Sequence, residues 1–124
     1  MPVRLCSGSY TAYTIGEDLV PRDACPLVKS VMGWEIGASP LYENCALMVI
    51  PVTCDCKKKL AGMLEQWKPT VTLHVPSSKE RDADMAEYVR ELYRLISMLE
   101  EATGRQITPQ SLAEAINQKG YAQY

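Results

Sequence analysis

The stretch that decides the fold is LMVIPVTCDCKKKLAGMLEQWKPTVTLHVP, which runs from residue 47 to residue 76. It begins with a continuous apolar run, residues 47–50, which is typical of a strand buried on both faces. Apolar side chains then recur at the spacing of an amphipathic helix that ends before Pro69, namely Leu60, Met63, Leu64 and Trp67. The β-branched run at 71–75 predicts a second strand that ends at Pro76. Strand, helix and strand in this order indicate a parallel α/β layer.

The segments before this stretch have less regular patterns. Residues 3–5 resemble a short strand, and residues 7–18 are expected to form a loop because Gly8 and Gly16 interrupt them. A helix is predicted to begin at the acidic and proline-containing run 21–26 and to end at Gly33. Its apolar positions are Leu27, Val28, Val31 and Met32.

Two helices are predicted after the second strand. Ser77 and Glu80 suggest a capping box for a long helix that Gly104 closes. The apolar seam of this helix consists of Met85, Tyr88, Leu92, Leu95 and Leu99. A last helix is expected to open at Thr108 and to end at Gly120. Two or three strands are few for a parallel sheet, so we expect either an oligomer or one segment of something larger.

Composition excludes several classes of protein. The chain has 124 residues, 47% of them hydrophobic and 23% charged, as in one soluble globular domain. Its net charge of -2 gives no basis for binding nucleic acid or an anionic membrane. The longest apolar stretch, residues 45–52, is far too short to span a bilayer, and no secretory signal opens the chain. The sequence therefore predicts a cytoplasmic protein.

Cysteine placement gives the strongest chemical signal. The five cysteines are an odd number, which argues against a closed disulfide framework. Cys54 directly follows the first predicted strand, and both Cys25 and Cys54 stand where a predicted helix begins. The unpaired N–H groups of a helix N-terminus favour a thiolate, and two such thiolates suit a thiophilic metal or an iron–sulfur cluster. The alternative is that each cysteine is a small core residue.

The residues around Cys54 admit more than one interpretation. Cys56 makes a close Cys-x-Cys pair with Cys54, whereas no Cys-x-x-Cys pair of a zinc finger or ferredoxin occurs. The run Lys57–Lys59 opposes the dipole of its helix, so it is either a solvated face or a partner for a nearby anion. His74 ends a strand and is expected to be structural. Cys6 and Cys45 have no partner spacing and are also expected to be structural.

The two cysteine segments resemble a known family. PRDACPLVKS at 21–30, followed by Gly33, is similar to the first cysteine motif of the 2-hydroxyacyl-CoA dehydratase and benzoyl-CoA reductase family. TCD at 53–55, followed by KKKL at 57–60, is similar to its second cysteine motif. The tail LEEATG at 99–104 and the helix that follows Ile107 and Thr108 also match the D-component of the 2-hydroxyglutaryl-CoA dehydratases.

The resemblance implies a two-lobe subunit with Rossmann-like α/β topology, a parallel sheet flanked by helices. It also implies a 4Fe-4S cluster held by three cysteines between the lobes, with Cys25 and Cys54 matching two of them. Cys56 stands where the family usually has a small residue and is a further candidate ligand. The family's third ligand lies in a second lobe, and no cysteine follows Cys56 here. We therefore expect residues 1–124 to form a single partial domain of one lobe, with a sheet region at 1–76 and a helical region at 77–124.

The family dehydrates 2-hydroxyacyl-CoA thioesters to enoyl-CoA through a ketyl radical. The resemblance thus implies a lyase of anaerobic metabolism with an acyl-CoA substrate, a companion dehydratase subunit and an ATP-dependent iron–sulfur activator protein. A chain without the second lobe is expected to pair as a homodimer. One alternative is a reductase subunit of the benzoyl-CoA reductase or double-cubane type. Another is a non-catalytic remnant that binds a metal or a partner.

Overall fold

The computed structural model describes residues 2–3, 8–37, 39–78 and 80–121. The chain divides into two compact units, Met1–Ser77 and Ser78–Tyr124. The short strand expected at 3–5 lies outside the described residues except for Val3, which belongs to no strand. The prediction of one partial domain stays a prediction.

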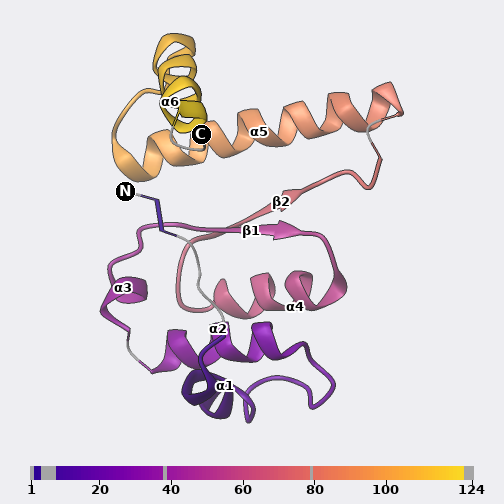
Figure 1. The fold of residues 1–124 in the computed structure, drawn as a ribbon, viewed down its shortest axis with the longest axis vertical. Coiled ribbons are helices and arrows are strands. Elements are labelled where there is room, and N and C mark those ends of the chain that lie inside the picture. The colour runs from indigo at the N-terminus through magenta and orange to yellow at the C-terminus, as the bar shows by residue number, and fades with distance from the viewer. Residues whose placement is uncertain (1, 4–7, 38, 79, 122–124) are drawn as a thin grey trace. The chain divides into compact units, whose positions relative to one another are not determined.

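The first unit contains a parallel pair of strands, β1 (Met48–Val52) and β2 (Thr70–His74). Met48 faces Thr70 at the start of the pair, and Val52 faces His74 at its end. Helix α4 (Asp55–Leu64) joins the two strands, which lets both run in the same direction (Figure 1). The predicted α/β class and the parallel sheet, a Rossmann-like fragment, are confirmed.

In the described part of the chain, three helices precede the sheet: α1 (Tyr10–Gly16), α2 (Pro26–Ile36) and the short α3 (Pro40–Glu43). The loop expected at 7–18 is wrong, because the Ser9 side chain accepts a hydrogen bond from the Ala12 N–H at 3.2 Å and caps α1. Gly33 does not end α2, which continues to Ile36 and has Gly37 as its C-cap.

Helices α1 and α2 cross at a contact between glycines. A Cβ at Gly16 would overlap the Lys29 carbonyl oxygen, and a Cβ at Gly33 would overlap the Ala12 carbonyl oxygen. Only glycine lets the two backbones approach this closely. The glycines that in sequence look like helix breakers are therefore the residues that allow two helices to pack.

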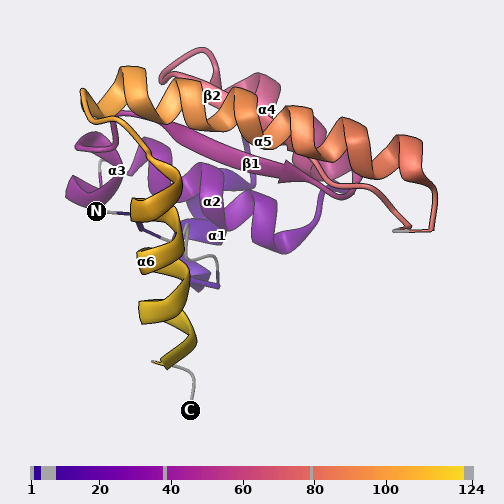
Figure 2. The ribbon, with the colours of Figure 1, turned by 90° about the horizontal axis from the view of Figure 1, so that it is seen from above.

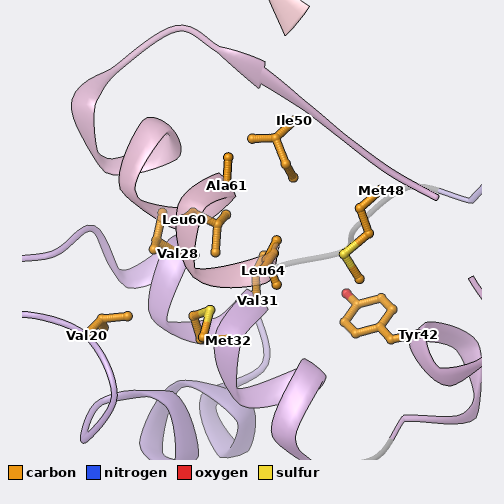
Figure 3. Packing of buried hydrophobic residues seen from close by; sticks show 10 residues of the cluster. All are labelled: Val20, Val28, Val31, Met32, Tyr42, Met48, Ile50, Leu60, Ala61 and Leu64. Atoms are coloured by element: carbon orange, nitrogen blue, oxygen red, sulfur yellow. The ribbon is translucent and has the colours of Figure 1, made fainter. Parts of the chain in front are cut away.

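The core of the first unit lies on one face of the sheet. Helix α4 packs against both strands, α2 packs against α4, and α1 packs against α2 (Figure 1). Met32 and Leu64 are fully buried where α2 meets α4, as Figure 3 shows. The buried cluster is completed by Val20, Val28, Val31, Tyr42, Met48, Ile50, Leu60 and Ala61. This packing fixes the starts of α2 and α4 relative to the sheet.

The second unit consists of α5 (Asp82–Thr103) and α6 (Pro109–Tyr121), which do not run side by side (Figure 2). Gly104 ends α5 as predicted: its φ is 66°, and its N–H donates to the Glu100 carbonyl at 2.8 Å. The predicted capping box is wrong. Arg81 is the N-cap, and the Ser78 hydroxyl accepts from the Glu80 N–H before the helix begins. Thr108 caps α6, since its hydroxyl accepts from the Ser111 N–H at 3.1 Å.

Candidate functional site

The two predicted ligands lie at the same edge of the sheet. Both strands end at this edge, and both α2 and α4 begin there (Figure 1). Cys25 is the N-cap of α2, and Cys54 is the N-cap of α4. In open parallel sheets, this edge is where sites form. The predicted placement of the two cysteines is confirmed.

Cys54 is exposed and follows β1 after a single residue, Thr53. Its backbone is extended, with φ -159° and ψ 164°, and its carbonyl accepts from the Lys58 N–H at 3.2 Å. The thiol makes no capping hydrogen bond. Asp55 follows in the first turn, where a carboxylate is favoured by the helix dipole. The thiol therefore stands at the positive end of α4 without a capping role.

Cys25 is half-buried and packs against the hydrophobic core. Its carbonyl accepts from the N–H groups of Val28 at 2.9 Å and Lys29 at 3.1 Å, which begin the hydrogen-bond ladder of α2. Pro26 occupies the first helical position, where its missing N–H costs nothing. The thiol makes no capping hydrogen bond here either.

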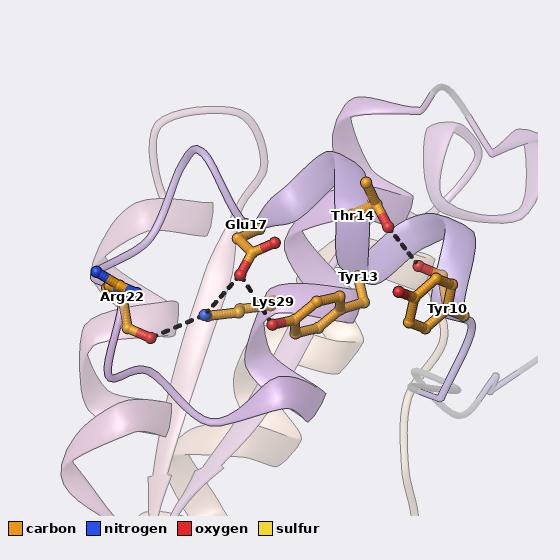
Figure 4. Close-up of polar contacts among 6 residues, drawn as sticks. All are labelled: Tyr10, Tyr13, Thr14, Glu17, Arg22 and Lys29. Carbon is orange, nitrogen blue, oxygen red and sulfur yellow. Dashed lines mark hydrogen bonds and ion pairs between the residues drawn. The ribbon is translucent and has the colours of Figure 1, made fainter.

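A buried lysine, Lys29, lies in the first turn of α2, four residues after Cys25. The Lys29 side chain is only 4% exposed, and its Nζ donates to the Arg22 carbonyl at 2.9 Å. The same Nζ is 3.6 Å from Glu17 Oε1 and 5.3 Å from the centre of the Tyr13 ring. Figure 4 shows these groups, the Lys29 cluster, together. Sequence reasoning missed this cluster, because Tyr13 and Glu17 fall in the segment expected to be a loop.

Cys56 lies differently from the two N-cap cysteines. It is half-buried against the core and lines a small pocket of about 40 Å³ with Asp23, Lys59 and Met63, among others. Small-molecule sites usually measure about 300–1,000 Å³, so this pocket is far smaller than such a site. The role of Cys56 as a ligand stays a prediction.

The described residues do not form a complete metal site by themselves. Among them, no three His, Cys, Asp or Glu side chains gather closely enough to hold a metal ion. Cys25, Cys54 and Cys56 form no disulfides. The two thiols at helix N-termini therefore fit part of the ligand set of a thiolate-bound metal or cluster. The described residues alone do not complete such a ligand set.

The remaining candidate residues are divided between the two edges. His74 ends β2 at the same edge as the N-cap cysteines, and Lys57 turns back so that its Nζ donates to the Thr53 hydroxyl at 3.0 Å. Cys45 lies at the opposite edge, before β1 begins, and its N–H donates to the Tyr42 carbonyl. Cys6 lies outside the described residues.

Glu35 is the other charged residue of α2, and it is partly buried. Its Oε2 is buried and has no hydrogen-bond partner among the described residues. Burial raises the pKa of the Glu35 carboxyl above its usual 4.5, and the charge of Lys68 opposes that shift. Glu35 lies near the end of α2, away from the cysteine edge.

The fold defines the class: a parallel α/β unit with cysteines as the N-caps of two helices that begin where its strands end. The chain belongs to the family of the 2-hydroxyglutaryl-CoA dehydratase D-component, whose model matches residues 1–123. It is also 35% identical over 115 residues to an Escherichia coli K12 protein described as "Putative dehydratase subunit YjiM". That match covers 92% of this chain, and the chain spans 30% of the length of that relative. No helix in the described ranges is long and apolar enough to cross a membrane.

Proposed function

We propose that this chain is a portion of a 2-hydroxyacyl-CoA dehydratase subunit, and that Cys25 and Cys54 supply two thiolate ligands of a 4Fe-4S cluster. The proposal rests on the family match together with one observation: both cysteines are N-caps of helices that begin at the same edge of the sheet. When bound, the cluster supplies one-electron chemistry to a 2-hydroxyacyl-CoA. A companion subunit and an ATP-dependent iron–sulfur activator complete the proposed assembly.

The chain's own residues support the cluster in two ways. The helix N-termini present N–H groups and a partial positive charge to the thiolates, which favours the charged form that binds iron. Because Cys54 is exposed to solvent, a cluster bound to its thiol is also accessible to a second protein segment. The third ligand is proposed to come from the part of the subunit that the relative has and this chain does not span.

The test is anaerobic reconstitution of the 124-residue chain with ferrous iron and sulfide. We expect Cys25→Ser and Cys54→Ser each to abolish the bound iron, the bound sulfide and the visible absorption, because each removes one of two thiolates. The measurement must exclude air, since a cluster with a missing ligand exposes its iron to oxygen. Handled in air, the chain is expected to hold no cluster.

Cys45→Ser is the matched control, because Cys45 precedes β1 and lies at the opposite edge of the sheet. It should leave the iron and sulfide content unchanged. Cys56→Ser decides whether that half-buried thiol contributes a further bond. Full iron and sulfide content in Cys54→Ser would remove Cys54 from the ligand set.

Turnover then separates the candidate reactions. The chain, combined with its companion subunit and an activator ATPase, is expected to convert a 2-hydroxyacyl-CoA to an enoyl-CoA. Reduction of an aromatic acyl-CoA instead would assign the reductase branch of the family. Cluster binding without either activity would assign a metal-binding remnant.

A further inference from the structure

Lys29 is a buried cation whose side-chain partners come from helix α1, its C-cap and the segment just before Cys25. Burying an ammonium group is costly unless hydrogen bonds and opposite charge replace the lost water. Lys29 has both, since Nζ donates to the Arg22 carbonyl at 2.9 Å and lies 3.6 Å from the Glu17 carboxylate. The face of the Tyr13 ring adds a cation–π contact at 5.3 Å.

These contacts hold the segment that carries Cys25 at two points. The Lys29 side chain holds the carbonyl of Arg22, three residues before Cys25, and the Lys29 backbone N–H holds the carbonyl of Cys25 itself at 3.1 Å. The Ala24 N–H also donates to the Pro21 carbonyl at 2.8 Å, which closes a turn over residues 21–24. One residue therefore fixes both ends of the short segment 22–25.

Helix α1 and its C-cap residue Glu17 support this arrangement. The Tyr13 hydroxyl donates to Glu17 Oε1 at 2.9 Å, and the same oxygen faces Lys29 (Figure 4). Glu17 directly follows Gly16, whose missing Cβ lets α1 lie against the Lys29 carbonyl. A metal ligand must be held to within a fraction of an ångström, which requires such packed support.

We propose that Lys29 is a positioning residue for Cys25: its ammonium group ties the 22–25 segment to α1 and α2 and so sets the place of the Cys25 thiol at the start of α2. The inference rests on the proposed function for its consequence, which is that iron binding depends on Lys29. The position of the thiol itself can be tested without iron.

The experiment compares alkylation rates of two thiols in the same folded chain by mass spectrometry, with iodoacetamide as the probe. In Lys29→Met, the rate at Cys25 relative to Cys54 should rise about fivefold or more, since loss of a charge-assisted hydrogen bond shifts a local opening equilibrium by that order. Lys29→Arg, which keeps the donor and the charge, should restore much of the wild-type ratio. Reconstituted iron content should fall in Lys29→Met and recover in Lys29→Arg.

Lys68→Met is the matched control. Lys68 also donates from Nζ to a backbone carbonyl, that of Glu43 at 3.1 Å, but it follows α4 and lies toward the other edge of the sheet. This variant should leave the Cys25 to Cys54 ratio unchanged. If Lys29→Met does not fold, Glu17→Gln decides the question, because it weakens the same cluster and should raise the ratio in the same direction.

An unchanged Cys25 to Cys54 ratio in the folded Lys29→Met or Glu17→Gln chain would overturn the positioning role. The failure of the proposed function looks different: full iron content in Cys25→Ser would remove Cys25 as a ligand, while the alkylation ratio would still report how Lys29 holds it.

Discussion

Lys29 and Glu35 lie on the same helix and meet burial in opposite ways. The Lys29 ammonium group replaces its water with a carbonyl, a carboxylate and an aromatic face. Glu35 has a buried oxygen with no hydrogen-bond partner in the described ranges. The Lys29 charge therefore supports the fold around Cys25, whereas the buried carboxylate of Glu35 lowers the stability of the folded chain.

The cost at Glu35 predicts a pH dependence of stability. Because burial raises the pKa of this carboxyl, the folded chain holds a proton there at pH values where the unfolded chain has released it. The resulting stabilisation is complete below the usual value of 4.5 and is lost as pH rises through the folded-state pKa. In Glu35→Gln this loss disappears, so the variant should gain stability relative to wild type as pH rises above that range. Urea unfolding across pH measures the difference.

Lys68 provides the control for this effect. Its charge lowers the pKa of Glu35 and so opposes the effect of burial. Lys68→Met should therefore enlarge the loss of stability with rising pH, provided that Glu35 is present. Parallel pH profiles for wild type and Glu35→Gln would show that the carboxyl does not titrate differently in the two states.

Among the elements, the crossing of α1 and α2 depends most on individual residues. Gly16→Ala places a methyl group against the Lys29 carbonyl oxygen, which is backbone and cannot move aside. We expect a loss of about 1–3 kcal/mol in the free energy of unfolding, the usual range for overpacking. Chemical denaturation monitored by circular dichroism measures it.

Gly62→Ala is the matched substitution on another helix. Gly62 lies within α4, and a Cβ there meets nothing within 4 Å. Alanine should stabilise the chain by about 0.5–1 kcal/mol, because glycine is the poorer helix former. Equal effects of the two substitutions would mean that the close approach of α1 and α2 does not decide the cost.

The sequence predicted those elements whose signals are local. The strands predicted at 47–52 and 71–75 are found at 48–52 and 70–74, and they follow from apolar and β-branched patterns. The helix between them and the αL cap at Gly104 follow from apolar periodicity and glycine chemistry. Helix α1 could not be predicted in this way, because Gly16 looks like a breaker until its partner helix is known. The same holds for the site. The places of Cys25 and Cys54 follow from element boundaries, whereas the Lys29 cluster depends on the crossing of α1 and α2.

At the scale of the whole molecule, the sheet of the described residues has two strands, and the chain spans 30% of its E. coli relative. Large apolar side chains stay half exposed, including Leu27 at 55% and Trp67 at 50%. We expect the isolated chain to self-associate, most simply as a homodimer, because such surfaces favour association. Sedimentation velocity over a range of concentrations measures this. Glutamate at Leu92 and Leu95, in the seam predicted on α5, should shift the chain toward the monomer.

A single monomeric species at every concentration would contradict this expectation. A companion subunit that abolishes self-association of the wild-type chain would show instead that the same surface serves the dehydratase assembly.

The crossing of α1 and α2 also has a consequence for the order in which the chain folds. Its contacts join two helices that follow one another in the chain, so they form without closing a long loop. Strand β1 can pair with β2 only once the chain between them, which contains α4, has been made. During synthesis the α1–α2 pair also leaves the ribosome before β1, α4 and β2. The Lys29 cluster can therefore assemble before β1, the strand that leads to Cys54, has been made. The Cys25 thiol would then be oriented before Cys54 has been added to the chain.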